Sequence, residues 1–239
     1  MTKRTGLGAR LYHNGADLSN DIESIGTIGA PRNTLPATGI DKSAHERMIA
    51  HRDGVISAVA FFNPTATHGL LAALPTGDNV VTAAPIGNAL GYPAASMAGK
   101  QVNYDPTRAA DGALTFAVDQ VANGSGLDWG EVFGEITDTS ATNSASIDAG
   151  AASTNGWAAY LHVIAFTGTN CTVTLEGSSD DGAVDTFTSI GAFTAATGVT
   201  AERIAGTGAL ERYVRVATSG TFTSITFVVN FVRYEAAVS

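Results

Sequence analysis

Imidazole and carboxylate side chains gather in one short stretch of the sequence, where they could bind a divalent metal ion. The candidate ligands are Asp41, His45, Glu46, His51 and Asp53. Nitrogen and oxygen ligands of this kind suit several transition metals. However, Lys42, Arg47 and Arg52 alternate with them, and these positive charges would repel a cation and pair with the acids instead. We therefore expect ionic contacts, within this segment or with a neighbouring subunit, and not a metal site.

A second acidic group could supply the oxygen ligands of a calcium loop. It consists of Asp180, Asp181 and Asp185 around Gly182. These residues lack the full ligand spacing of such a loop. We therefore interpret the segment as an acidic hairpin turn.

The motifs of common enzymes are missing from the sequence. There is no Gly-x4-Gly-Lys-Ser/Thr phosphate loop, no His-Glu-x2-His zinc motif, no pair of cysteines and no Gly-x-Ser-x-Gly nucleophile elbow. Gly124-Ser-Gly126 with Gly130 lacks the surrounding strand–loop–helix unit, so we expect a plain turn. A glycan hydrolase would need two carboxylates about 5–10 Å apart, and no sequence feature brings two acids into a pocket. We expect a protein that is not an enzyme and uses no cofactor.

The remaining reactive side chains are isolated in the sequence. The histidines outside the first stretch, none with a recognisable Ser or Cys partner, are His13, His68 and His162. The single cysteine, Cys171, excludes a disulfide within the chain. Residues 170–176 alternate as a strand does, which places Cys171, Val173 and Leu175 on one face. We expect that face to pack in the core.

Composition points to a chain that buries much of its surface in an assembly. Only 15% of the 239 residues are charged, the net charge is −9 and the pI is about 4.8. An acidic balance without basic clusters argues against nucleic-acid binding. The N-terminus has no apolar segment typical of a secretory signal, and no apolar run reaches the ~18 residues of a membrane span.

Short alternating segments predict an all-β protein with one short helix. The expected strands are 8–12, 22–28, 54–62, 80–84, 98–104, 112–122, 157–166, 172–176, 187–193, 210–217 and 221–234. The segments 167–170 and 218–220 are typical of hairpin turns. Residues 67–74 predict the helix, and residues 29–53, with little strand character, predict a long loop.

Differences in composition and strand pattern along the sequence predict two domains. Residues 1–136 contain all seven prolines and form one predicted domain. Residues 137–156 are small and polar, which indicates a linker or a long loop. Residues 157–239 predict a second domain, a β-sandwich of the jelly-roll or immunoglobulin-like kind.

Several segments resemble a known family in their order and spacing. They include Gly39-Ile-Asp-Lys-Ser-Ala-His-Glu-Arg47, Arg52-Asp-Gly54, Phe61-Phe-Asn-Pro64, Leu74-Pro-Thr76, Lys100-Gln-Val-Asn-Tyr-Asp-Pro-Thr-Arg108, Asp111-Gly-Ala-Leu-Thr-Phe116 and Leu127-Asp-Trp-Gly130. These resemble the major tail proteins of siphophages that infect actinobacteria. Arg212-Tyr-Val-Arg-Val216, Gly220-Thr-Phe-Thr223 and Phe231-Val-Arg233 resemble the accessory β-domain often fused to such proteins.

The resemblance implies a structural virion protein of the phage tail, assembled in the host cytoplasm. Subunits of this family are β-sandwiches or barrels with one flanking helix. They form hexameric rings that stack into a tube around a tape-measure protein, between the tail terminator and the baseplate. Genomic DNA passes through without specific binding. The runner-up interpretation is a capsid decoration protein or a virion protein that binds cell-surface glycans.

The resemblance also assigns roles to particular residues. A loop over residues 31–53 would contact the next ring through Arg32, Asp41, Lys42, Glu46, Arg47, Arg52 and Asp53. Asp119 is a candidate for a residue that lines the lumen. DNA binds tightly where Lys and Arg contact its phosphates and release counterions, so a negatively charged lumen would keep the DNA mobile. The C-terminal domain would lie outside and could touch host-surface glycans.

Overall fold

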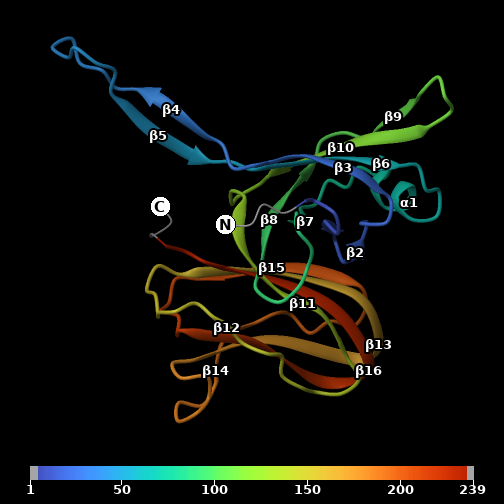
Figure 1. Cartoon of the computed structure of the whole chain (residues 1–239), viewed down its shortest axis with the longest axis vertical. Helices are drawn as coiled ribbons and strands as arrows, with labels where there is room; N and C mark the ends of the chain where they lie inside the picture. Colours follow the sequence, from blue (N-terminus) through green and yellow to red (C-terminus); the bar gives the residue numbers. More distant parts are fainter. Residues whose placement is uncertain (1–4, 236–239) are drawn as a thin grey trace. The chain divides into compact units, whose positions relative to one another are not determined.

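The computed structural model describes residues 5–235, and its regular secondary structure is almost entirely β-strand (Figure 1). The predicted all-β class is confirmed. No helix among the described residues is long and apolar enough to cross a membrane. The chain divides into two compact units. Unit 1 comprises residues 5–20, 79–96 and 129–235, and unit 2 comprises residues 21–78 and 97–128.

Unit 1 contains strands from the beginning, the middle and the end of the described chain. They are β1 (Arg10–His13), β2 (Ala16–Asp17), β7 (Asn79–Ala84), the first part of β8 (Tyr92–Gln101), β11 (Asp128–Asp138), β12 (Ile147–Asp148), β13 (Trp157–Ser178), β14 (Thr188–Ala192), β15 (Thr200–Gly206) and β16 (Tyr213–Arg233). The strand order is β14–β13–β16–β11, with β15 also on β13 and β12 also on β16.

The two longest strands, β13 and β16, pair antiparallel along nearly their whole length. The hairpin turns predicted at 167–170 and 218–220 are therefore wrong, because each segment lies inside a continuous strand. The glycines that suggested a turn instead accompany irregular pairing, which bends a ribbon without reversing the chain. Gly168 permits this close approach, since a Cβ there would lie 2.4 Å from Cα of Phe222.

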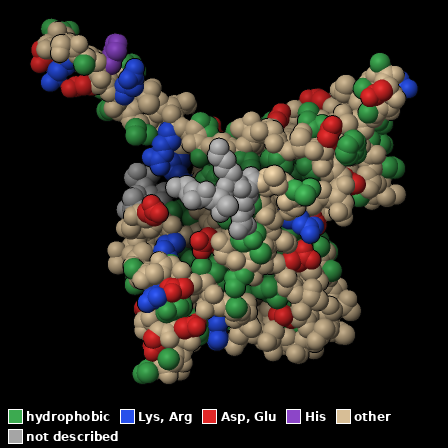
Figure 2. All heavy atoms as spheres, viewed as in Figure 1, with side chains coloured by type: hydrophobic (Ala, Val, Ile, Leu, Met, Phe, Trp, Pro, Cys, Tyr) green, Lys and Arg blue, Asp and Glu red, His purple; other side chains and the backbone are tan. Residues whose placement is uncertain are grey.

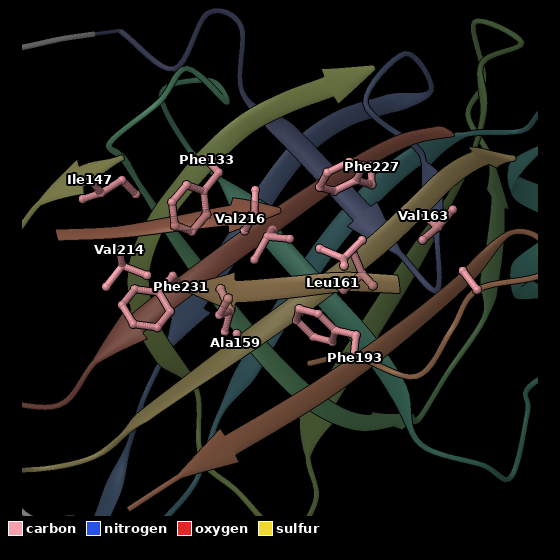
Figure 3. Packing of buried hydrophobic residues seen from close by; sticks show 14 of the residues in the cluster. Phe133, Ile147, Ala159, Leu161, Val163, Phe193, Val214, Val216, Phe227 and Phe231 are labelled. Carbon is pink, nitrogen blue, oxygen red and sulfur yellow. The ribbon is translucent and has the colours of Figure 1, made fainter. Parts of the chain in front are cut away.

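Apolar side chains from both long strands fill the interior of unit 1 (Figure 3). Members of this cluster include Phe133, Leu161, Val163, Phe193, Val216, Phe227 and Phe231. Cys171, Val173 and Leu175 lie in the same core, which confirms the packing role predicted for that face. Burial raises the pKa of the Cys171 thiol to about 11. Each large side chain buried here contributes about 1.5–3 kcal/mol.

The division into compact units differs from the division predicted along the sequence. Residues 5–20 and 79–96 belong with residues 129–235 and not with the rest of the N-terminal half. The reason is long-range pairing: β1 pairs with β7, and both β2 and β7 contact β13. Residues 139–156 run along β16 and include the short strand β12, and the side chain of Ile147 in this segment is buried.

Unit 2 contains one antiparallel sheet, one hairpin and one short helix. Its elements are β3 (Ile22–Gly29), β4 (Arg32–Pro36), β5 (Arg47–Arg52), β6 (Val55–Phe61), α1 (Thr67–Leu71), the second part of β8, β9 (Asp105–Arg108) and β10 (Leu114–Ala122). The sheet order is β8–β10–β6–β3, with β9 also paired to β10, and β4 pairs only with β5.

The helix begins where the sequence predicts and ends earlier, at Leu71. Leu74 has a φ of 44°, a conformation that an L-residue does not adopt within a right-handed helix. The side chain of Leu71 is buried, and the Leu71 carbonyl accepts a 2.7 Å hydrogen bond from Nε2 of Gln101. These contacts attach α1 to the sheet of unit 2.

Candidate assembly surfaces

Strands β4 and β5 form a hairpin that projects from the other strands of unit 2 (Figure 1). The irregular loop expected over residues 31–53 is therefore wrong in its conformation. Thr34 lies opposite Ile49, and Leu35 lies opposite Met48. Both faces of the hairpin are largely exposed, so the segment has no alternation of buried and exposed residues. That alternation is the usual sequence signal of a strand.

Large apolar side chains are exposed on this hairpin. The exposed fractions are 52% for Leu35, 57% for Met48 and 66% for Ile49, and Ile40 is fully exposed. In Figure 2 hydrophobic side chains lie beside acidic and basic ones along the projecting hairpin. A single exposed apolar residue is ordinary on a protein surface. Several on one two-stranded ribbon mark an interaction surface.

All seven charged residues predicted to contact a neighbouring ring lie on the hairpin or directly after it. They are Arg32, Asp41, Lys42, Glu46, Arg47, Arg52 and Asp53. Lys42 Nζ lies 3.6 Å from Glu46 Oε1, with both side chains about half exposed. A pair of this kind contributes only about 0–1 kcal/mol. Apart from that of Arg52, these charges are therefore largely available to a partner, and the role of all seven residues between rings stays a prediction.

Arg52 differs from the other six because it holds the base of the hairpin. Its guanidinium donates a 3.1 Å hydrogen bond to the Leu127 carbonyl and forms an ion pair with the Asp128 carboxylate. The Asp128 side chain is only 1% exposed. Removing one partner of a buried ion pair leaves the other charge uncompensated, so Arg52 is needed for stability. The turn predicted at 124–126 is confirmed and precedes these partners, between β10 and β11.

Asp119 lies on the partly exposed face of the unit 2 sheet, which carries a mixture of polar and apolar side chains. On β10 and β6 the buried side chains alternate with partly exposed ones. Asp119 is partly exposed and lies opposite Ser57. Its Oδ2 accepts a 2.8 Å hydrogen bond from Nδ2 of Asn103. The register places the basic residue Lys100 on this face, where Asp78 neutralises it at 2.7 Å.

Strand β3 ends the sheet of unit 2. It pairs with β6 along one edge, and the strand order of the described chain gives no partner for its other edge. Ser24 and Thr27 lie on the same face as Val59 and Ser57 of β6. An edge of this length exposes backbone donors and acceptors that can pair with another chain.

The core of unit 1 contains a histidine, His162, whose hydrogen-bond partners could not be predicted from the sequence. His162 is fully buried within β13, and burial, helped by the nearby His13, lowers its pKa to about 3. Its Nδ1 accepts the backbone N–H of Gly15 at 3.2 Å, so Nε2 carries the proton and donates to Thr82 Oγ1 at 2.9 Å. His162 therefore cannot accept a proton from that hydroxyl. A fully buried polar side chain in an apolar strand must find such partners.

The hydrogen-bond chain continues away from His162. Thr82 Oγ1 lies 2.7 Å from Ser96 Oγ, which accepts from Nδ2 of Asn230 at 2.7 Å. All of these side chains are fully buried. No substrate could reach them without unfolding, so this cluster stabilises the core.

The acidic segment around Gly182 is a turn between β13 and β14, as predicted. The Asp180 carboxylate accepts backbone N–H groups from Ala183 at 3.1 Å, Val184 at 2.8 Å and Asp185 at 3.1 Å. These hydrogen bonds lower the pKa of Asp180, against the effect of burial. Across residues 5–235 the structure brings together no group of three His, Cys, Asp or Glu residues that could hold a metal ion.

Comparisons with known proteins give little further constraint. No protein-family model matches the sequence, and no curated protein matches it. Among solved structures, one that covers 94% of this chain and 99% of its own has a TM-score of 0.35 at 15% identity. It is the phage SPP1 Dit protein, described as a paradigm of the hub adsorption apparatus in phages that infect Gram-positive bacteria. A similarity of this extent does not establish a common fold.

Proposed function

We propose that this chain is a structural protein of a phage tail, and specifically a subunit of the tail tube. The observation that carries the proposal is the β4–β5 hairpin. A two-stranded hairpin exposed on both faces is at best marginally stable in water, yet this one exposes Leu35, Met48 and Ile49. A neighbouring copy of the chain would bury these side chains and order the hairpin. Residues 39–47, a segment that resembles siphophage major tail proteins, form most of the tip of the hairpin and include the first residue of β5.

The sheet of unit 2 supports the same proposal. A tube requires each subunit to add its sheet to the next, and β3 offers an edge for that pairing. On the face that carries Asp119, the basic residue Lys100 forms an ion pair with the acidic residue Asp78. A face with balanced charge offers few net cationic contacts, so duplex DNA would slide over it, because phosphate binding depends on Lys and Arg contacts.

Electron microscopy of the concentrated protein tests the proposal. We expect tubes with a central channel and six-fold end views. Met48→Asp with Ile49→Asp should prevent them at the concentration where the unchanged chain assembles, because two side chains worth about 1.5–3 kcal/mol each would no longer be buried between copies. The critical concentration for assembly should rise at least about 100-fold, which corresponds to about 2.7 kcal/mol.

The matched control is Val184→Asp, which places the same charge at a residue of unit 1 that is 90% exposed. This variant should still form tubes, and circular dichroism should show that both variants keep their strands. Discrete particles at all concentrations would contradict the proposal. Antibody label on virions should follow the tail shaft. Label confined to the capsid would favour a decoration protein, and label confined to the tail tip would favour a hub protein.

A further inference from the structure

Unit 1 contains an open groove of about 340 Å³ that combines an exposed indole ring with charged groups. Trp129 lines it and is 49% exposed. Ile147 and Phe231, which belong to the core cluster, close its apolar side. Glu131, Arg233 and Glu235 supply the polar groups. The volume lies near the lower end of the ~300–1,000 Å³ typical of small-molecule sites.

The guanidinium of Arg233 in the groove is held in place by two hydrogen bonds. Arg233 donates to Ser153 Oγ at 3.2 Å and to the Glu211 carbonyl at 2.6 Å. Glu131 lies two residues after Trp129 on β11, so both side chains are on one side of the strand. Burial raises the pKa of the Glu131 carboxyl, and the positive charge of Arg233 partly offsets this effect. The groove therefore holds a carboxylate and a guanidinium beside an aromatic ring.

We propose that this groove binds a neutral hexose unit of a polysaccharide. A pyranose ring has a flat face of C–H groups that can stack on the indole of Trp129, because an aromatic side chain offers a large apolar surface. Each sugar hydroxyl both donates and accepts hydrogen bonds. The carboxylate of Glu131 can accept from hydroxyls at the ring edge, and the guanidinium of Arg233 can donate to them.

The surroundings of the groove disfavour other ligand classes. A peptide that binds as an added strand needs a free strand edge, but β11 and β16 already pair with each other, with Glu131 opposite Phe231. An anionic ligand would meet Glu131 and Glu235 against the single charge of Arg233. A sugar without charge avoids that repulsion and can still bond to Glu131 and Arg233.

Tryptophan fluorescence of the full chain can detect this binding. The chain has two tryptophans, and Trp157 is only 5% exposed, so the solvent-sensitive emission comes from Trp129. Maltoheptaose, cellohexaose, mannohexaose and galactohexaose serve as neutral probes, and heparin serves as the anionic probe. We expect at least one neutral probe to shift the emission to shorter wavelength and to protect it from acrylamide quenching.

Variants separate a binding site from a merely exposed ring. Calorimetry should show that Trp129→Ala weakens binding at least about tenfold, as loss of one stacking aromatic does elsewhere. Trp129→Tyr should restore part of the affinity, and Glu131→Gln should weaken binding while the thermal midpoint stays unchanged. Val184→Ala, at an exposed position in the β13–β14 turn, is the control and should bind normally.

Three results would overturn the proposal. One is the absence of any response to the neutral probes up to about 10 mM, a concentration that detects even millimolar affinity. Another is unchanged affinity in Trp129→Ala. The third is binding of heparin alone, which would contradict the charge argument. Binding is measured on dilute chains, so its failure is distinct from a failure to form tubes, and Trp129→Ala should still form tubes.

Discussion

Acidification should destabilise unit 1, because two of its histidines are buried as neutral side chains. Burial lowers the pKa of His162 to about 3 and that of His13 to about 4, from an ordinary value of 6.5. Below pH 6.5 the unfolded chain therefore binds protons that the folded chain does not. The free energy of unfolding is unaffected above pH 6.5 and falls as the pH drops from 6.5 toward these folded-state values.

The expected size of the effect follows from the two pKa values. Each pH unit between the folded and the unfolded pKa removes about 1.4 kcal/mol per histidine. At pH 5 each histidine should therefore cost about 2 kcal/mol, and the pair about 4 kcal/mol. This loss is a large part of the ~5–15 kcal/mol that stabilises a typical domain.

Urea unfolding followed by the fluorescence of the buried Trp157, at several pH values between about 8 and 5, measures this loss. His162→Gln lacks one titrating group, so its stability should fall by only about 2 kcal/mol over that range. His51→Gln, at an exposed position of β5, is the control and should retain the full pH dependence. Parallel loss of stability in the unchanged protein and in His162→Gln would refute the reasoning.

Three further perturbations probe other contacts. Arg52→Ala should lower the free energy of unfolding by about 3–5 kcal/mol, because it removes the ion-pair partner of the buried Asp128 carboxylate. Arg52→Lys should lose less, and urea unfolding midpoints of the two variants measure the difference. Gly99→Ala should lower the free energy of unfolding by at least about 1–3 kcal/mol, since the new Cβ would lie 2.2 Å from a carbonyl oxygen of β10. The control Gly77→Ala, with open space around the new Cβ, should leave the thermal midpoint nearly unchanged. The buried Cys171 thiol should resist a thiol reagent at about pH 8 until urea unfolds the chain, and rapid labelling of the folded protein would contradict its burial.

The sequence predicts strands well where one face is buried and poorly where the chain bends or projects. Alternation around Cys171 correctly indicated a strand and a core face. The turns expected at 167–170 and 218–220 were wrong because glycine favours turns and strand irregularities alike. Only the partner strand distinguishes the two, and β13 and β16 are paired by residues far apart in sequence.

The resemblance to tail proteins identified candidate contact residues, but the sequence did not predict the strands or the ion pair in which they lie. The hairpin of β4 and β5 lacks a buried face, so no hydrophobic period reveals its strands. Arg52 was grouped with exposed charges because its partner Asp128 lies far along the chain. His162 stood within an apolar run, which signals a need for polar partners, but Thr82 could not be identified without the fold.

The interleaving of the two units along the chain determines when the protein can fold during synthesis. Unit 1 begins with β1 near residue 10 and is completed only by β16, which ends at Arg233. The long strand β13 must therefore wait for β16 before their extensive pairing can form, and such non-local pairing is slow. Nascent chains would consequently acquire their native core only after β16 has been made. Growth of a polymer would then draw on finished molecules, and truncated chains, which lack β16, would be excluded from it.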